Sequence, residues 1–260
     1  MAGQIVRKLT PEEEELLRKR EELASVRAAL AERELELADL RAQLKSFEGR
    51  YLRQVGVLYA ELDDWDAKIA ELEATLRPSA TASQQAQESH KRAEETREAA
   101  HGEASKARDF QPSADLKSLF REAAKRIHPD FAKDDADQKL RTRLMAQANE
   151  AYSQGNADAL QRILDEFGNS PESVQGEGVG AELVRIIRQI HQAKKNIAAI
   201  EQQLASLRAT EIAQLRQDVE TAEKEGRDLL AELADSVRKR IAKMKKKHDG
   251  LALELKKHGR

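Results

Sequence analysis

The 260-residue chain has no cysteine, few aromatic residues and no long apolar run, and each absence excludes a class of structure. Without cysteine it has no disulfides, no thiolate zinc site and no cysteine nucleophile. Aromatic residues make up 3% of the chain and charged residues 35%, which is typical of long solvated helices rather than of one large globule. No segment approaches the roughly 18 uncharged apolar residues that a membrane span needs. We therefore expect a cytoplasmic protein without a membrane span.

The charges of the chain are nearly balanced, with 45 basic and 47 acidic side chains. This balance does not indicate a chain that binds polyanions over its whole length. The six histidines have no metal-ligand spacing, and the sequence contains neither a nucleophile motif nor a phosphate-binding loop in its usual context. We therefore predict a protein that is not an enzyme and that carries no cofactor and no metal.

Five prolines divide the chain, because proline is poorly tolerated inside a helix. They predict an all-α protein built from consecutive segments. These are an N-terminal coiled-coil helix over 11–77, a polar Ala-rich linker over 78–111, a small helical domain over 112–168, a Gly-containing linker over 169–180 and a C-terminal coiled-coil helix over 181–257.

The N-terminal helix carries a leucine heptad that begins at Leu16 and recurs every seven residues through Leu44. A second apolar stripe interleaves with it. Around Tyr51 to Val55 two steps of four residues occur together, and such a stutter locally unwinds a coiled coil. Four aromatic residues lie near the stutter, and we interpret them as a locally thicker helix–helix seam, with a docking patch as the alternative: Phe47, Tyr51, Tyr59 and Trp65.

The C-terminal helix repeats the heptad pattern, with a phase shift after Leu207. Gly226 lies within this run and is either a close-packing point or a bend. Both long helices need a partner for their apolar stripes, and their lengths nearly match. The acidic cluster at 12–15 and the basic end at 237–248 predict antiparallel pairing, since a parallel homodimer would bring like charges together.

These features predict a long antiparallel coiled-coil stalk formed within one chain, with the small helical domain inserted between its two helices. A monomeric hairpin and a homodimer both remain compatible with the pattern. The basic C-terminal end lacks interleaved aromatic residues. We therefore interpret it as a solvated helix end and do not expect it to bind nucleic acid.

The middle segment contains or adjoins the other five aromatic residues, which indicates a compact helical unit. Ser113 is a suitable N-cap for a first helix, and Pro129 ends that helix, because proline disfavours helical geometry in the residue before it. Gly155 ends a second helix, and Asn156 or Asp158 caps a third.

A His-Pro-Asp tripeptide at 128–130 lies in the loop between the first two of these helices. A Phe-Arg pair precedes it at 120–121, and the sequence Asn-Glu-Ala-Tyr follows at 149–152 in the second helix. This combination within residues 113–167 resembles the J domain of DnaJ-type co-chaperones. J domains usually begin with a short aromatic-rich helix that this chain lacks, so the third helix or the stalk would cover the apolar face left open.

The resemblance implies recognition of a partner without catalysis by this chain. Asp130 would be the main contact with a DnaK-type ATPase, His128 would orient the loop through hydrogen bonds, and Pro129 would fix its bend. A basic row on the first helix would steer association with the acidic surface of that ATPase, and it consists of Lys117, Arg121, Lys125 and Arg126.

The function that the resemblance implies is a co-chaperone that stimulates ATP hydrolysis by a DnaK-type ATPase, with the coiled coil setting the client or the location. The alternative is a structural coiled-coil scaffold or adaptor whose central bundle binds another protein without chaperone activity. The two hypotheses differ in the role of Asp130, which is a required partner contact only in the first.

Overall fold

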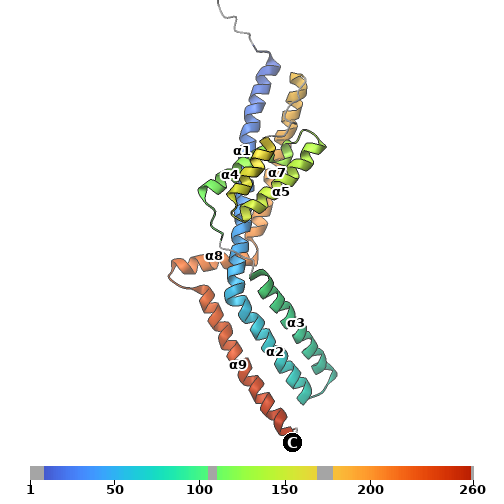
Figure 1. Cartoon of the computed structure of the whole chain (residues 1–260), viewed down its shortest axis with the longest axis vertical. Helices are drawn as coiled ribbons and strands as arrows, with labels where there is room; N and C mark the ends of the chain where they lie inside the picture. The colour runs from blue at the N-terminus through green and yellow to red at the C-terminus, as the bar shows by residue number, and fades with distance from the viewer. Residues whose placement is uncertain (1–8, 105–109, 169–177, 259–260) are drawn as a thin grey trace, which may run out of the picture. The chain divides into compact units, whose positions relative to one another are not determined.

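The computed structural model describes residues 9–104, 110–168 and 178–258 of the chain. In these ranges the chain forms helices and no strand, so the predicted all-α class is confirmed (Figure 1). Within the same ranges, no helix combines the length and the apolar content needed to cross a membrane. The chain divides into two compact units: unit 1 contains Met1–Ala42 and Phe110–Ala209, and unit 2 contains Gln43–Asp109 and Thr210–Arg260.

The first helix, α1 (Pro11–Tyr51), begins at a capping box. The backbone N–H of Glu13 donates to Thr10 Oγ1 at 3.3 Å, and the backbone N–H of Thr10 donates to Glu13 Oε2 at 2.9 Å. The heptad leucines from Leu16 to Leu44 are buried, as their spacing predicts.

The predicted stutter coincides with a π-helical segment, η1 (Leu52–Gly56), which joins α1 to α2 (Val57–Leu76). A π-helical turn contains more residues than an α-helical turn, so it shifts the phase of the apolar stripe. The change of phase in the sequence is therefore accommodated without an interruption of the helical backbone.

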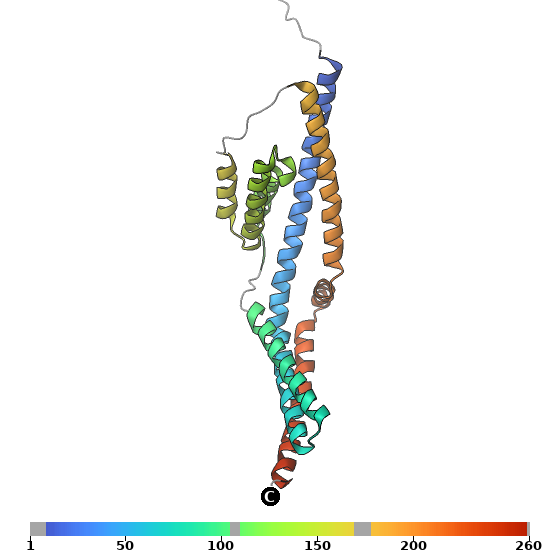
Figure 2. The same cartoon turned by 90° about the vertical axis from the view of Figure 1, so that its right-hand side faces the viewer.

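In unit 1, α7 (Val179–Arg208) lies beside α1, and the two helices run parallel (Figure 2). Their apolar stripes share one buried cluster, which includes Leu23 and Leu30 from α1 and Ile190 from α7. Ion pairs join residues whose numbers rise together along both helices, and they are Arg20–Glu182, Glu22–Lys194, Arg33–Glu201 and Glu36–Arg208. The predicted antiparallel direction of the stalk is therefore wrong.

The wrong direction has a physical reason. The antiparallel prediction rested on charge clusters at two helix ends, but α7 carries two glutamates as well as several basic residues, and α1 carries both signs of charge along its length. Opposite charges can therefore be matched in either direction. The path of the chain decides between them, because α7 begins beside the first turns of α1.

A three-helix bundle packs against α1 within unit 1. Its core contains the fully buried side chains of Phe120, Leu144 and Leu160, together with Ala31 and Leu35 of α1. The apolar faces of the first two bundle helices are thus covered by the third bundle helix and by α1. The bundle consists of α4 (Ala114–Ile127), α5 (Asp135–Ser153) and α6 (Ala157–Gly168).

The ends of the bundle helices follow the local sequence signals. Ser113 Oγ accepts a hydrogen bond from the backbone N–H of Leu116 at 3.1 Å, as an N-cap does. Gly155 adopts a positive φ of 70° after α5, a conformation in which glycine has no Cβ penalty. Asn156 Oδ1 accepts from the backbone N–H of Ala159 at 3.0 Å and caps α6.

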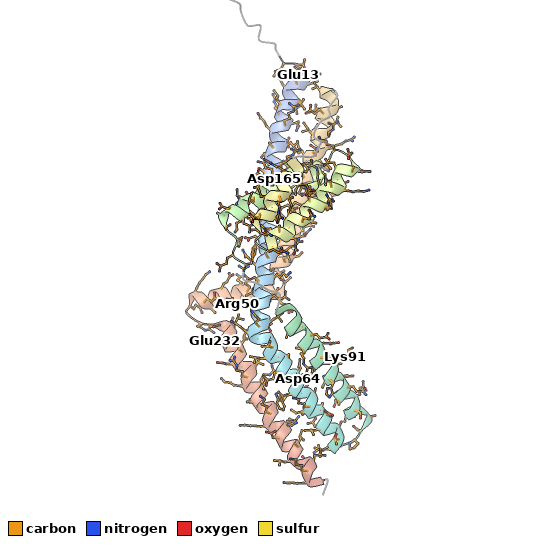
Figure 3. The ribbon with its side chains drawn as sticks, in the orientation of Figure 1. Glu13, Arg50, Asp64, Lys91, Asp165 and Glu232 are labelled. Atoms are coloured by element: carbon orange, nitrogen blue, oxygen red, sulfur yellow. The ribbon has the colours of Figure 1, made fainter. Side chains whose placement is uncertain are left out.

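In unit 2, α3 (Ala80–Ala104) packs antiparallel against α2 and corrects the prediction of a linker over 78–111 for residues 80–104. Residues 105–109 of that linker lie outside the described ranges. The segment has no large apolar residue, but Ala93 and Ala100 are buried and allow a close helix–helix approach. Ion pairs then fix the alignment, because three aspartates of α2, including Asp64 (Figure 3), face two arginines of α3. Buried alanines and flanking ion pairs therefore hold α3 against α2. The linker prediction had counted only large apolar residues, which this helix lacks.

The C-terminal run is also not one helix. After α7 it continues as α8 (Glu211–Lys224) and α9 (Leu229–His258), with the first break at the predicted phase shift. Gly226 has φ 78° and no atom within 4 Å of where its Cβ would lie, so it is a bend rather than a close-packing point. In unit 2, α9 lies beside α2, where Val237 and Ile241 share a cluster with Leu62.

The aromatic residues near the stutter pack inside unit 2 against α8 and α9. Phe47 is buried with Val219 and Leu230, and Tyr51 and Tyr59 border the same cluster. Trp65 borders the cluster of Leu62, Val237 and Ile241. This packing agrees with the interpretation of a locally thicker seam.

Candidate functional site

The loop that carries the His-Pro-Asp tripeptide is built by the end of α4. Helix α4 stops at Ile127, and His128 has an extended ψ of 134°, as expected for a residue before proline. Pro129–Phe131 then forms one 3₁₀ turn, η2, in which the backbone N–H of Phe131 donates to the carbonyl of His128 at 3.1 Å. The tripeptide is therefore a tight, hydrogen-bonded turn between α4 and α5.

Arg141 of α5 supports this turn from within the bundle. Its Nη1 donates to the carbonyl of Arg126 at 2.8 Å, and its Nε donates to Asp137 Oδ1 at 2.7 Å. The Asp137 carboxylate also accepts from the backbone N–H of Lys133 at 2.9 Å, so it connects the loop exit to α5. Sequence reasoning missed these two buried residues, and their only signal was an i, i+4 Asp–Arg spacing.

His128 is buried and links the loop to α1. Its Nδ1 accepts from the backbone N–H of Asp130 at 3.2 Å. Nε2 lies 3.3 Å from Glu34 Oε1 of α1. His128 thus orients the loop through hydrogen bonds, and its second nitrogen is held by a carboxylate that sequence reasoning did not single out.

Asp130 contacts α7 instead of solvent. Its side chain is only 8% exposed, and both carboxylate oxygens accept from Asn196 Nδ2, at 2.6 and 2.7 Å. Burial raises the pKa of Asp130 above its ordinary value, while nearby His128 and the Asn196 hydrogen bond act in the opposite direction. The residue expected to make the main partner contact is therefore held inside unit 1.

Two of the four basic residues of α4 are paired with α1. Lys117 Nζ lies 3.2 Å from Asp39 Oδ2, and Arg121 Nε lies 2.8 Å from Glu32 Oε1. Lys125 and Arg126 are exposed, and Arg126 pairs with Glu122 of its own helix at 2.6 Å. Helix α1 therefore presents carboxylates to half of the basic row.

Three residues of the Phe-Arg and Asn-Glu-Ala-Tyr sequences lie in the bundle core, and they are Phe120, Ala151 and Tyr152. Phe120 and Tyr152 are fully buried, and their ring centroids lie 4.7 Å apart. Tyr152 O–H donates to Asp39 Oδ1 at 3.2 Å, so Asp39 joins the basic row of α4 to the core of the bundle. Burial, followed by the nearby Asp39 carboxylate, raises the pKa of Tyr152.

Unit 1 thus brings together all seven residues expected to bind a partner, from 117 to 130, on one side of the bundle. Glu32, Glu34 and Asp39 of α1 and Asn196 of α7 face several of them. Their contacts in the structure are thus made within unit 1, through ion pairs and hydrogen bonds. Comparison of the chain with protein-family models, curated proteins and solved structures found no match.

Proposed function

We propose that the protein is a J-like co-chaperone of the cytoplasm, which binds a DnaK-type ATPase and stimulates its ATP hydrolysis. The observation that carries the proposal is the position of the His-Pro-Asp turn between antiparallel helices α4 and α5, next to the basic row of α4. The Phe-Arg and Asn-Glu-Ala-Tyr sequences that accompany the tripeptide support it further. The long helices would set the client or the location.

The contacts of Asp130 within unit 1 must open before Asp130 can bind the ATPase. Asn196 donates to both oxygens of its carboxylate, so an ATPase donor can engage Asp130 only after this contact opens. The same holds for Arg121, which a partner carboxylate would have to take from Glu32. We infer that binding exchanges contacts within unit 1 for contacts with the partner, and that association weakens as salt rises.

The test measures steady-state ATP hydrolysis by a purified DnaK-type ATPase with and without the full-length protein. The wild-type chain is expected to accelerate hydrolysis, and Asp130→Asn is expected to abolish the acceleration while circular dichroism stays unchanged. Asn196→Ala, which frees Asp130, is expected to stimulate at a lower protein concentration than the wild type. Equal stimulation by wild type and Asp130→Asn would contradict the proposal.

A structural scaffold is the second candidate, and the burial of the loop favours it. A turn whose histidine, aspartate and phenylalanine are all engaged by α1 or α7 can serve to dock the bundle on the two long helices. In that case neither the wild type nor Asn196→Ala would stimulate the ATPase, whereas Asn196→Ala would still destabilise unit 1. The ATPase measurement separates the candidates, because the loss of stability in Asn196→Ala is expected in both.

A further inference from the structure

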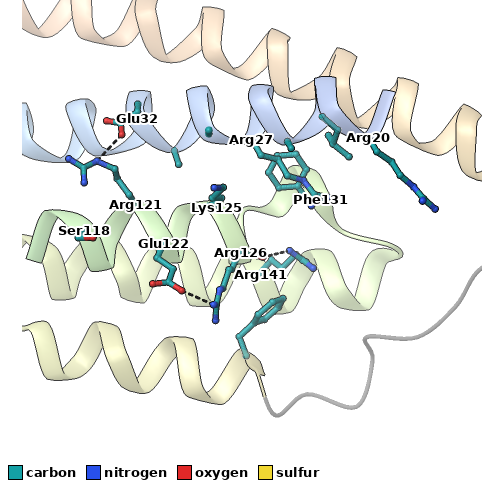
Figure 4. A pocket seen from close by; sticks show the side chains of 15 residues that line it. Arg20, Arg27, Glu32, Ser118, Arg121, Glu122, Lys125, Arg126, Phe131 and Arg141 are labelled. Atoms are coloured by element: carbon teal, nitrogen blue, oxygen red, sulfur yellow. Dashed lines mark hydrogen bonds and ion pairs between the residues drawn. The ribbon is translucent and has the colours of Figure 1, made fainter. Parts of the chain in front are cut away.

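A pocket of about 920 Å³ lies in unit 1 between α1 and the bundle (Figure 4). One wall is formed by α1 from Arg20 to Glu32, and the opposite wall by α4 from Ser118 to Arg126. Phe131 and Phe167 also line it. Its volume is within the range of small-molecule sites in proteins.

Most of the charged residues that line the pocket are basic. Its lining contains only two acidic residues, Glu32 and Glu122. The basic residues that line it outnumber them and are Arg20, Arg27, Arg121, Lys125, Arg126 and Arg141. Low-dielectric walls lined by one sign of charge concentrate the field and attract ions of the opposite sign.

Most of these cations are already neutralised by carboxylates, but two are not. The neutralised pairs are Arg20–Glu182, Arg121–Glu32, Arg126–Glu122 and Arg141–Asp137. Arg27 and Lys125 have no carboxylate partner within the described ranges of the chain. They come from opposite walls, since Arg27 belongs to α1 and Lys125 to α4 (Figure 4).

Arg27 is the more unusual of the two. Its guanidinium lies 4.3 Å from the centroid of the Phe131 ring, and its buried Nε has no hydrogen-bond partner among the described residues. Burial and then the nearby charge of Arg141 lower the pKa of Arg27. Burying a cation without a counter-charge raises the free energy of the folded protein, and an anion bound beside it lowers that free energy.

Apart from Ser118, the uncharged residues that line the pocket are apolar. Leu23, Ala28 and Ala31 of α1 contribute to it, and two aromatic rings complete it, those of Phe131 and Phe167. A site of this kind accommodates an apolar body beside a charged head group. A lone inorganic anion would leave this apolar surface uncovered.

We propose that this pocket binds a small organic dianion, a phosphate monoester or a dicarboxylate with an apolar or aromatic body. The head group lies between Arg27 and Lys125, and guanidinium nitrogens bind its oxygens through charge-assisted hydrogen bonds. The body lies against the apolar lining. This binding does not depend on the proposed co-chaperone function, although Arg121, Lys125 and Arg126 of the basic row line the pocket.

The test is isothermal titration calorimetry of the full-length protein with phenyl phosphate and with phthalate, an aromatic dicarboxylate. Saturable binding of at least one probe is expected, with weaker binding of inorganic phosphate and none of the neutral benzyl alcohol. The comparison of the two aromatic probes identifies the preferred head group. Absence of saturable heat with both probes at millimolar concentration would overturn the proposal.

Matched variants locate the site. Arg27→Met keeps the aliphatic packing on Phe131 and should weaken binding by about tenfold or more. Lys125→Met changes an exposed side chain, so it should retain the fold and weaken binding as well. Arg18→Met is the control, because Arg18 lies on the same helix, is 75% exposed and does not line the pocket. Equal weakening by the control and by the two pocket variants would reveal unspecific charge attraction and refute the site.

Discussion

The contact between Asn196 and Asp130 allows a quantitative prediction about unit 1. Asn196→Ala removes the donor of two short hydrogen bonds to a carboxylate whose side chain is 8% exposed. Hydrogen bonds to charged groups contribute about 1.5–3 kcal/mol, and the carboxylate left behind is still largely shielded from water. We therefore expect the free energy of unfolding to fall by about 2–3 kcal/mol at pH 7.

The effect should depend on pH in a defined direction. The Asn196 hydrogen bond acts to lower the pKa of Asp130, since it favours the ionised carboxylate. The stabilisation by this hydrogen bond is therefore present while Asp130 is ionised. It is lost as the pH falls through the raised pKa that Asp130 has in the folded protein. At a pH below the ordinary value of 3.8, the variant and the wild type should differ much less.

The assay is thermal unfolding followed by circular dichroism, in which a loss of this size lowers the Tm of a unit of this size by about 5–10 °C. Gln202→Ala is the matched control, because Gln202 lies exposed on the same helix. A double-mutant cycle with Asp130→Asn isolates the pairwise contribution. The reasoning is refuted if Asn196→Ala lowers the free energy of unfolding no more than the control does. It is also refuted if Asn196→Ala lowers it equally in the wild type and in the Asp130→Asn background.

Three further predictions concern other parts of the chain. Gly226→Ala should destabilise unit 2 by about 1 kcal/mol in urea unfolding, because the φ of Gly226 is 78° and a Cβ is unfavourable there. Gly250→Ala should stabilise unit 2 by about 0.5–1 kcal/mol, because alanine favours a helix interior more than glycine does and Gly250 lies inside α9. Hydrogen bonds from Lys19 and Lys194 lower the pKa of Glu22 to about 2. The small stabilisation by the ionised Glu22 should therefore be present above pH 4.5 and be lost as the pH falls towards 2. Carboxyl titration by NMR checks this, and an unshifted Glu22 would contradict it. Tyr152→Phe should cost about 1 kcal/mol in urea unfolding through loss of its bond to Asp39, and an unchanged midpoint would contradict that contact.

Local features of the fold were predictable because they depend on few neighbouring residues. Ser113 caps α4, Pro129 ends it and Gly155 follows α5 for reasons of backbone geometry that any tertiary context would leave in place. The leucine heptads predict which side chains are buried, and the irregular spacing near Tyr51 marks the π-helical segment. The composition alone favours helices over strands.

The candidate site was predictable only in part. The tripeptide, the basic row and the Phe-Arg and Asn-Glu-Ala-Tyr sequences were singled out through their resemblance to J domains, and the bundle brings them to one region of unit 1. Asn196 could not be identified, because it is 66 residues from Asp130 and has no motif of its own. Arg27 could not be identified from the sequence either, because it is one of many charged residues on α1 and only its neighbours in the structure distinguish it.

The sequence by itself determined the ends of the bundle helices, which faces of the long helices are apolar and which residues form the turn at 128–130, since these properties arise within a few residues along the chain. Only the tertiary structure decided that α1 and α7 run parallel, that the alanine-rich segment packs as α3, and that Asp130 faces an asparagine rather than water. The physical reason is that apolar stripes and alternating charges are compatible with several pairings. The path of the whole chain selects one of them and thereby sets the surroundings of each side chain.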